Sequence, residues 1–471
     1  MFNLDNFTFL FYDYETFGID TVLDKPAQFA CIRTDINFNI VDIPLEFFCY
    51  PPVDYLPNPE SILITGISPN YTRKYGTNEF EFSSKIYEQF SKPNTCIVGY
   101  NNIHFDDEIT RNIFYRNFID PYEWSWKNNN SRWDMLDVLR ACYVLRPNGI
   151  NWPFKKNLKV PSFKLSNISK FNNIDHSHAH SAISDVQATL EVAKLLKNKQ
   201  PRLFNYFFKY RKKQELLKIV DIYNIKPLIY ISRFFGSERK NISVIAPISW
   251  NFYNQNILIG FDLTKSFKKF LAYFLNITTE MLNYKKLFEY GIVFVYMNRC
   301  PMLAPTNVIS SKRMLKLGIN YLVCNKNLSL IRSNHFLKKK IQFINSCFVF
   351  SKKNDIDLQI YDNFFSSSEK KVIKIIRAFL KENVFNRNLF ISSSKVRSLL
   401  KRCIARNFSH MLNHTERIFW IQYCNKKINQ DSINKYTKKI IYLLKLNYND
   451  FKNILLLKDL LRYINIFKKF F

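Results

Sequence analysis

The sequence has little glycine and no long apolar run. Only 9 glycines and 17 prolines occur among 471 residues, which excludes the Pro- and Gly-rich compositions of disordered or fibrous chains. No stretch approaches the 18 or more uncharged apolar residues of a membrane span, and residues 1–8 lack the basic region that begins a signal peptide. We therefore expect a folded, cytoplasmic chain without a membrane anchor.

Cysteine motifs are missing as well. The nine cysteines include no C-x-x-C pair and show none of the clustering of a small secreted scaffold. We therefore expect the cysteines to be reduced thiols in a cytoplasmic protein.

Negative charge is in short supply. Asp and Glu number 38 against 69 Lys and Arg, which gives a net charge of +31. A field of this size attracts polyanions, of which nucleic acid is the obvious one. The excess of Lys, Asn, Ile, Phe and Tyr is also what an AT-rich genome writes into permissive surface positions. Basicity alone therefore makes a nucleic-acid partner plausible without establishing it.

The length of the chain exceeds what one core usually supports, so two or three domains are expected. Up to about residue 200 the patterns favour strands that alternate with helices, which is typical of an α/β domain. Strands are expected at 7–14, 28–34 and 95–100, and helices at 81–90, 107–117 and 184–197. Short β-like runs follow at 244–246, 257–261 and 292–297, and helical periodicity at 370–381, 394–405, 415–425 and 435–466.

Two acids end the first expected strand. Asp13 and Glu15 stand two residues apart, and side chains alternate along a strand, so both carboxylates point to one face while Tyr14 points to the other. An acidic pair at a strand end is commonly only a solvated turn. This signal is weak when taken alone.

A further acid follows another expected strand. Asp106 and Asp107 lie between the strand at 95–100 and the helix at 107–117. One of the two is expected to cap the helix N-terminus, which leaves the other free to face a site.

A histidine and an aspartate lie near the start of the helix expected at 184–197. The apolar positions of that helix bury one side, so Asp185 in its first turn is able to reach a metal, and His180 lies in the preceding loop. The spacing of His176, His178 and His180 lacks the partnered Cys or His set that tetrahedral zinc needs, so zinc is not expected.

Together these motifs supply four carboxylates and one imidazole. Such a set suits two Mg²⁺ ions roughly 3.5 to 4 Å apart, which clamp the attacking water and the leaving oxygen of a phosphodiester. Mn²⁺ is expected to substitute. A histidine with a pKa near neutrality can take the proton of the attacking water.

This order of residues resembles the DEDDh branch of the proofreading exonucleases, which have a ribonuclease-H-like fold, and resembles the bacterial exonuclease I family more closely still. The resemblance covers most of the chain and is densest before residue 205. The matching runs are residues 11–18, 24–30, 63–67, 99–102, 105–108, 117–121, 130–134, 140–143, 145–152, 200–204, 299–301, 317–320, 363–365 and 405–408.

The resemblance implies an α/β multidomain architecture: a ribonuclease-H-like exonuclease domain at 1–200, an SH3-like β-containing domain at 201–352 and an all-helical domain at 353–471. It also implies a monomeric, processive 3′→5′ exodeoxyribonuclease that releases mononucleotides from single-stranded DNA during repair or recombination. The acidic C-terminal tail of single-stranded-DNA-binding protein is a further implied partner, although the matching runs thin out after about residue 410.

Individual roles follow from the same resemblance. It makes Asp13, Glu15 and Asp185 metal ligands, Asp106 the fourth acid and His180 the general base. It implies substrate contacts by Glu15, Lys164, Arg111, Tyr122, Trp126 and Arg140. Lys164 stands where the family usually has arginine; lysine keeps the charge but loses the bidentate fork.

Two other functions remain open at this point. An exoribonuclease would use the same five chemical residues, since nothing in the sequence marks a reader of the 2′-hydroxyl, although such relatives are usually much shorter. A non-catalytic single-strand-binding protein would keep the fold and lose cleavage. The presence of all five chemical residues argues against it.

Overall fold

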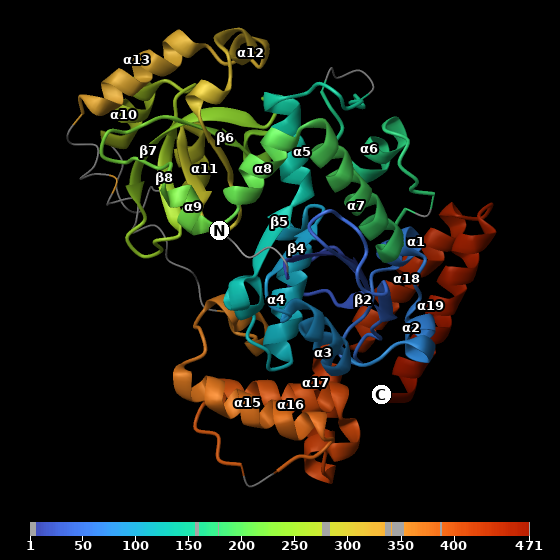
Figure 1. Ribbon diagram of the computed structural model, residues 1–471. Helices are drawn as coiled ribbons and strands as arrows, with labels where there is room; N and C mark the ends of the chain where they lie inside the picture. The colour runs from blue at the N-terminus through green and yellow to red at the C-terminus, as the bar shows by residue number, and fades with distance from the viewer. Residues whose placement is uncertain are drawn as a thin grey trace. The chain divides into compact units, whose positions relative to one another are not determined.

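The computed structural model describes residues 6–155, 160–177, 179–275, 283–334, 341, 353–386 and 389–470 (Figure 1). The chain divides into two compact units. The first contains Met1–Asn130, Ser177–Gln187 and Lys352–Phe471, and the second contains Ser131–His176 and Ala188–Ser351. Among the described residues, none of the helices combines the length and apolar character that a bilayer-crossing segment needs.

A mixed sheet forms the centre of the first unit. The strands of this sheet that belong to the first unit are β1 (Thr8–Thr16), β2 (Pro26–Thr34), β3 (Leu45–Phe48) and β4 (Thr95–Gly99), in the spatial order β3-β2-β1-β4. β1 runs antiparallel to β2 and parallel to β4. These strands include the three expected from the sequence, and every residue of β2 is buried.

The helices of the first unit come from both ends of the chain. They are α1 (Pro59–Thr65), α2 (Pro69–Tyr75), α3 (Glu79–Phe90), α4 (Asp106–Arg116), the first turns of α7 (Ala182–Lys199), α15 (Ser367–Lys381), α16 (Ser394–Asn407), α17 (His414–Lys427), α18 (Gln430–Leu446) and α19 (Phe451–Phe470). The expected mixture of strands and helices, followed by a helical C-terminal segment, is confirmed.

Side chains of β1 alternate between the two faces of the sheet. Leu10, Tyr12 and Tyr14 are buried in a core that α3 and α4 complete. The intervening residues face the other way and end in Asp13 and Glu15. One strand therefore contributes core packing on one side and two carboxylates on the other.

The periodicity at 435–466 predicts a single helix, and this prediction is wrong. α18 ends at Leu446 and α19 begins at Phe451, and the two helices pack against each other (Figure 1). Asp450 explains the break, because its carboxylate accepts a hydrogen bond from the backbone N–H of Asn453 at 3.0 Å and so starts a new helix.

A buried ion-pair network ties the loop after β3 to the C-terminal helices. Asp54, which is completely buried, accepts hydrogen bonds from Arg406 at 3.0 and 2.7 Å and from Lys427 at 2.9 Å. Arg406 also donates to Asp357 at 2.6 Å. Residues more than 300 positions apart thus share one set of charges inside the first unit.

The second unit contains an antiparallel five-stranded sheet in the order β10-β6-β7-β8-β9. The strands expected at 244–246, 257–261 and 292–297 correspond to β7, β8 and β9. The bounds are β5 (Ser131–Asp134), α5 (Met135–Leu145), α6 (Leu165–Phe171), α8 (Pro201–Lys209), α9 (Lys213–Leu217), β6 (Leu228–Ile231), β7 (Ile242–Trp250), β8 (Ile257–Asp262), α10 (Phe267–Leu275), α11 (Tyr284–Glu289), β9 (Ile292–Tyr296), β10 (Met302–Pro305), α12 (Ser311–Lys316) and α13 (Tyr321–Arg332).

Candidate active site

The C-terminal end of β1 carries the first two acids of the site. Asp13 and Glu15 are partly exposed, whereas Tyr14 between them is buried and its hydroxyl lies 3.0 Å from the Thr110 hydroxyl. Because Tyr14 is fixed in the core beneath the sheet, the strand end is rigid. The two carboxylates are therefore held on one face, as the spacing predicts.

Asp106 is the first residue of α4 and is 3% exposed. The expectation that Asp106 or Asp107 caps the helix is wrong, because Phe105 occupies the capping position and makes no side-chain cap hydrogen bond. Both acids instead lie in the first turn, where the helix dipole favours negative charge. The Asp106 carboxylate accepts a hydrogen bond from the backbone N–H of Tyr14 at 3.3 Å.

α7 brings the remaining two residues to the site. Its hydrogen bonding starts with the backbone N–H of Asp185 donating to the Ser181 carbonyl at 3.0 Å, so Asp185 lies in the first turn, as expected. His180 precedes the helix in a left-handed conformation with φ of 69° and is exposed. Such a backbone is uncommon outside glycine, and here it presents the imidazole outside the helix.

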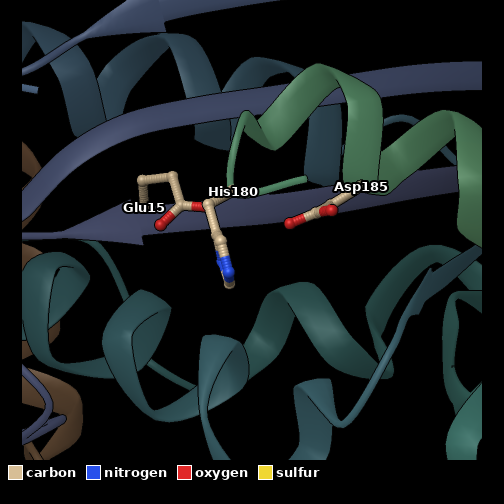
Figure 2. Close-up of side chains that lie close together, drawn as sticks. All are labelled: Glu15, His180 and Asp185. Carbon is tan, nitrogen blue, oxygen red and sulfur yellow. The ribbon is translucent and has the colours of Figure 1, made fainter. Parts of the chain in front are cut away.

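Figure 2 shows the Glu15, His180 and Asp185 side chains lying together, with the Asp185 carboxylate directed toward the other two. One possible ligand atom from each lies within 4.8 Å of the others. His176 is not a member of this group, and His178 lies outside the described residues.

The acids perturb one another electrostatically. Burial raises the pKa of Asp13, and the charges of its neighbours Asp106, Glu15 and Asp185 raise that pKa further. Burial, followed by the charges of Asp185 and Asp106, also raises the pKa of Glu15. All four carboxylates predicted from the sequence therefore converge closely enough to repel one another.

The repulsion among the four carboxylates and the oxygen atoms that they offer as ligands both fit a site for a divalent cation. Carboxylate oxygens are the ligands that Mg²⁺ and Mn²⁺ prefer, and a cation would relieve the repulsion that raises these pKa values. The imidazole of His180 at the edge of the cluster is available either to bind or to take up a proton.

Besides Glu15, three of the predicted substrate contacts lie in the first unit. Arg111 is buried, donates to Glu108 at 2.6 Å, and lies over the Tyr122 ring at 5.8 Å from its centre. Tyr122 packs against Phe364 with ring centres 5.3 Å apart. Trp126 differs, because 63% of its surface is exposed. Of the three, only Trp126 offers a largely open ring.

The other two predicted contacts, Lys164 and Arg140, lie in the second unit. Lys164 is exposed and precedes α6. Arg140 is on α5 and donates to Asp137 at 2.6 Å. Its guanidinium is thus oriented by an acid on the preceding turn of the same helix.

Sequence reasoning missed the support behind Asp106. Asp107 is completely buried, and its carboxylate accepts hydrogen bonds from the Tyr12 hydroxyl at 2.6 Å and from the Asn102 amide at 3.2 Å. The bond to Tyr12 fixes the first turn of α4 to β1, and the bond to Asn102 fixes it to the segment that precedes the helix. The adjacent aspartates and the inward-facing Tyr12 are the only signals in the sequence that could have indicated this contact.

Comparison with known families accounts for nearly the whole chain. The family model described as exonuclease matches residues 10–193. The exonuclease I SH3-like domain matches residues 211–346, and the exonuclease I C-terminal domain matches residues 354–467. The ribonuclease-H-like, SH3-like and helical architecture expected from the sequence is confirmed.

Curated relatives align over the same extent. Exodeoxyribonuclease I of Buchnera aphidicola subsp. Schizaphis graminum is 51% identical, with 98% of this chain and 95% of the relative covered. Exodeoxyribonuclease I of Escherichia coli K12 is 41% identical, with 97% of each covered.

Solved structures show the same fold. E. coli exonuclease I in complex with a dA16 oligonucleotide superposes with a TM-score of 0.92 at 40% identity, covering 98% of this chain and 100% of that one. The zinc-bound form of an E. coli ExoI–ssDNA complex has a TM-score of 0.89 at 40% identity, covering 98% and 100%. An ExoI/SSB-Ct complex has a TM-score of 0.91 at 39% identity, covering 98% and 99%. With three family models matched in succession and relatives aligned over nearly its full length, the chain belongs to the exonuclease I family.

Proposed function

We propose that the protein is a 3′→5′ exodeoxyribonuclease that hydrolyses single-stranded DNA to 5′-mononucleotides, acting as a processive monomer in DNA repair or recombination. The observation that carries the proposal is the convergence of Asp13, Glu15, Asp106 and Asp185 beside His180. Relatives that bear the name exodeoxyribonuclease I over their full length support the choice of DNA.

Exonucleases of this family are metal-dependent, and we assign the metal here as Mg²⁺, two ions in all, with Mn²⁺ able to substitute. Asp13, Glu15 and Asp185 would hold the ions, and Asp106 is the fourth acid. Their oxygen donors match the preference of Mg²⁺. When bound, the ions polarise the phosphodiester and make water acidic enough to attack at neutral pH.

His180 acts as the general base in this proposal. Its imidazole is exposed and lies beside Glu15 and Asp185, where it can accept a proton from the attacking water through a ring nitrogen. The left-handed backbone at His180 leaves the ring outside the helix.

Substrate contacts are assigned to Glu15, Lys164, Arg111, Tyr122, Trp126 and Arg140. Cationic side chains pair with phosphates, and aromatic faces stack on unpaired bases. The exposed face of Trp126 fits stacking. Glu108 holds the Arg111 guanidinium in a fixed position. From there the positive charge of Arg111 attracts the phosphate backbone of the DNA.

The proposal also covers the protein partner, the domain boundaries and the cellular location. The ExoI/SSB-Ct complex supports binding of the acidic tail of single-stranded-DNA-binding protein. The family-model ranges support domains at 1–200, 201–352 and 353–471. Eight cysteines of the described residues are buried thiols, which accords with a cytoplasmic location.

Asp13→Ala and Asp185→Ala test the proposal on end-labelled single-stranded DNA in Mg²⁺. Wild-type protein should release mononucleotides from the 3′ end, whereas both variants should bind the DNA and fail to cleave it. Asp431→Ala, at an exposed position of α18, is the matched control and should retain cleavage. Persistent cleavage by Asp13→Ala would refute the site, and faster digestion of an RNA of the same sequence would refute the substrate.

A further inference from the structure

Gln28 is a buried polar residue on the face of the sheet that carries the acids. It lies on β2 directly opposite Glu15 of β1 and is 4% exposed. Residues directly opposite on antiparallel strands place their side chains on the same face. The Gln28 amide is therefore a neighbour of the candidate site. Neither the motifs found in the sequence nor the proposed mechanism gives Gln28 a role.

Both ends of this amide are engaged. The Gln28 Oε1 accepts a hydrogen bond from the backbone N–H of Ala182 at 3.2 Å, and its Nε2 donates to the Glu46 carboxylate at 2.5 Å. A carboxylate accepts only, so Glu46 dictates which end of the amide faces it. Glu46 thereby turns the Gln28 oxygen toward α7.

The backbone N–H of Ala182 has a special position. It is one of the first amides of α7, which have no acceptor within the helix, and Ala182 is completely buried. It lies two residues after His180 and three before Asp185. A bond at this atom therefore fixes the short segment that carries both the proposed base and a proposed ligand.

We propose that Gln28 is a positioning residue, which docks the start of α7 on β2 and so sets His180 and Asp185 against Glu15. This inference deepens the proposed function and rests on it for the roles of those three side chains. Gln28 itself is not assigned a contact with metal or DNA. It acts through the Ala182 amide, with Glu46 orienting it.

Gln28→Leu removes both hydrogen bonds at similar volume. Loss of a supporting contact of this kind typically lowers metal affinity or activity about ten- to hundred-fold, so kcat in Mg²⁺ should fall by that factor while KM for single-stranded DNA stays at the wild-type value. Mn²⁺ affinity, measured by electron paramagnetic resonance, should fall as well. Gln187→Leu, at an exposed position on α7 itself, is the matched control and should change neither quantity.

A reciprocal double variant distinguishes positioning from simple loss of stability. In Gln28→Glu/Glu46→Gln the new carboxylate accepts from Ala182 and the new amide at 46 donates to it, so the bonding pattern is restored. We expect this variant to recover most of the lost kcat and Mn²⁺ affinity. Failure of the folded double variant to recover either would overturn the inference, as would a Gln28→Leu protein with wild-type kcat and Mn²⁺ affinity.

The two readouts also separate this inference from the proposed function. If wild-type protein did not cleave single-stranded DNA, the proposed function would fail, yet the Mn²⁺ titration would still report whether Gln28 sets the ligands. If Gln28→Leu did not fold, the double variant would decide: recovery of folding with impaired Mn²⁺ binding would refute the positioning role, and recovery of both would support it.

Discussion

Replacing Asp54 with asparagine should destabilise the first compact unit by about 3 kcal/mol, because removing one partner of a buried ion pair typically costs about 3 to 5 kcal/mol. Asp54 has no solvent exposure and accepts three hydrogen bonds from cations, two from Arg406 and one from Lys427. The lower end of the range applies because Arg406 keeps its contact with Asp357 at 2.6 Å.

The measurement is guanidinium denaturation followed by far-ultraviolet circular dichroism at pH 7. Glu60→Gln provides the control, since Glu60 also joins the N-terminal segment to a C-terminal lysine, Lys439, but both side chains are exposed. An exposed pair contributes about 1 kcal/mol or less. A destabilisation by Asp54→Asn no larger than that of the control would refute the reasoning.

The destabilisation should also depend on pH. Burial alone would raise the pKa of Asp54, but the charges of Arg406 and Lys427 outweigh it and hold the pKa below its ordinary value. A lowered pKa in the folded state stabilises the protein at every pH above the unfolded value, about 3.9, and this stabilisation is lost as pH falls further. The difference between wild type and Asp54→Asn should thus be constant from pH 8 to about 5 and shrink below about 4; a difference that grew on acidification would contradict the assignment.

Three further predictions concern the site. Mg²⁺ binding should release protons at pH 7, because burial and neighbouring carboxylates raise the pKa values of Asp13 and Glu15 and metal ligands must be deprotonated. The affinity for Mg²⁺ should therefore weaken as pH falls. Identical calorimetric heats of Mg²⁺ binding in buffers of different ionisation enthalpy would exclude the proton release. His180→Ala should lower kcat about 10²- to 10⁴-fold in single-turnover assays and leave DNA affinity unchanged in binding assays. An unchanged kcat with weakened DNA binding would reject His180 as the base. Trp126→Ala should weaken single-stranded DNA binding by about 1 to 3 kcal/mol, measured by fluorescence anisotropy, with an unchanged unfolding midpoint because the ring is exposed; intact affinity would remove it from the substrate path.

The elements nearest the site could be predicted because local pattern decides them. β1 is a short apolar and aromatic run that ends in acids, which predicts the strand, and the shared face of Asp13 and Glu15 follows from its period-2 geometry. His180 and Asp185 were also placed correctly, in the turn before α7 and in its first turn. The two residues are close together in the sequence, so the position at which the helix starts determines where both of them lie.

What the sequence could not indicate depends on long-range contacts. The capping assignment at Asp106 and Asp107 failed because Asp107 is drawn to the Tyr12 hydroxyl, a contact across 95 positions. The break between α18 and α19 was hidden because apolar periodicity continues on both sides of Asp450. Gln28 gave no signal, since its partners at Glu46 and Ala182 come together only after the sheet and α7 have formed.

The discontinuous make-up of the first unit has a consequence for synthesis on the ribosome. The loop that holds Asp54 is synthesised long before the arginine and lysine that neutralise it, at positions 406 and 427, so a nascent chain carries this acid without its partners until those two residues have been made. Domains generally fold as units during synthesis. The unit that contains the nuclease centre therefore cannot complete its ion-pair network until the helices that carry Arg406 and Lys427 have left the exit tunnel, which delays the mature DNA-degrading enzyme until then.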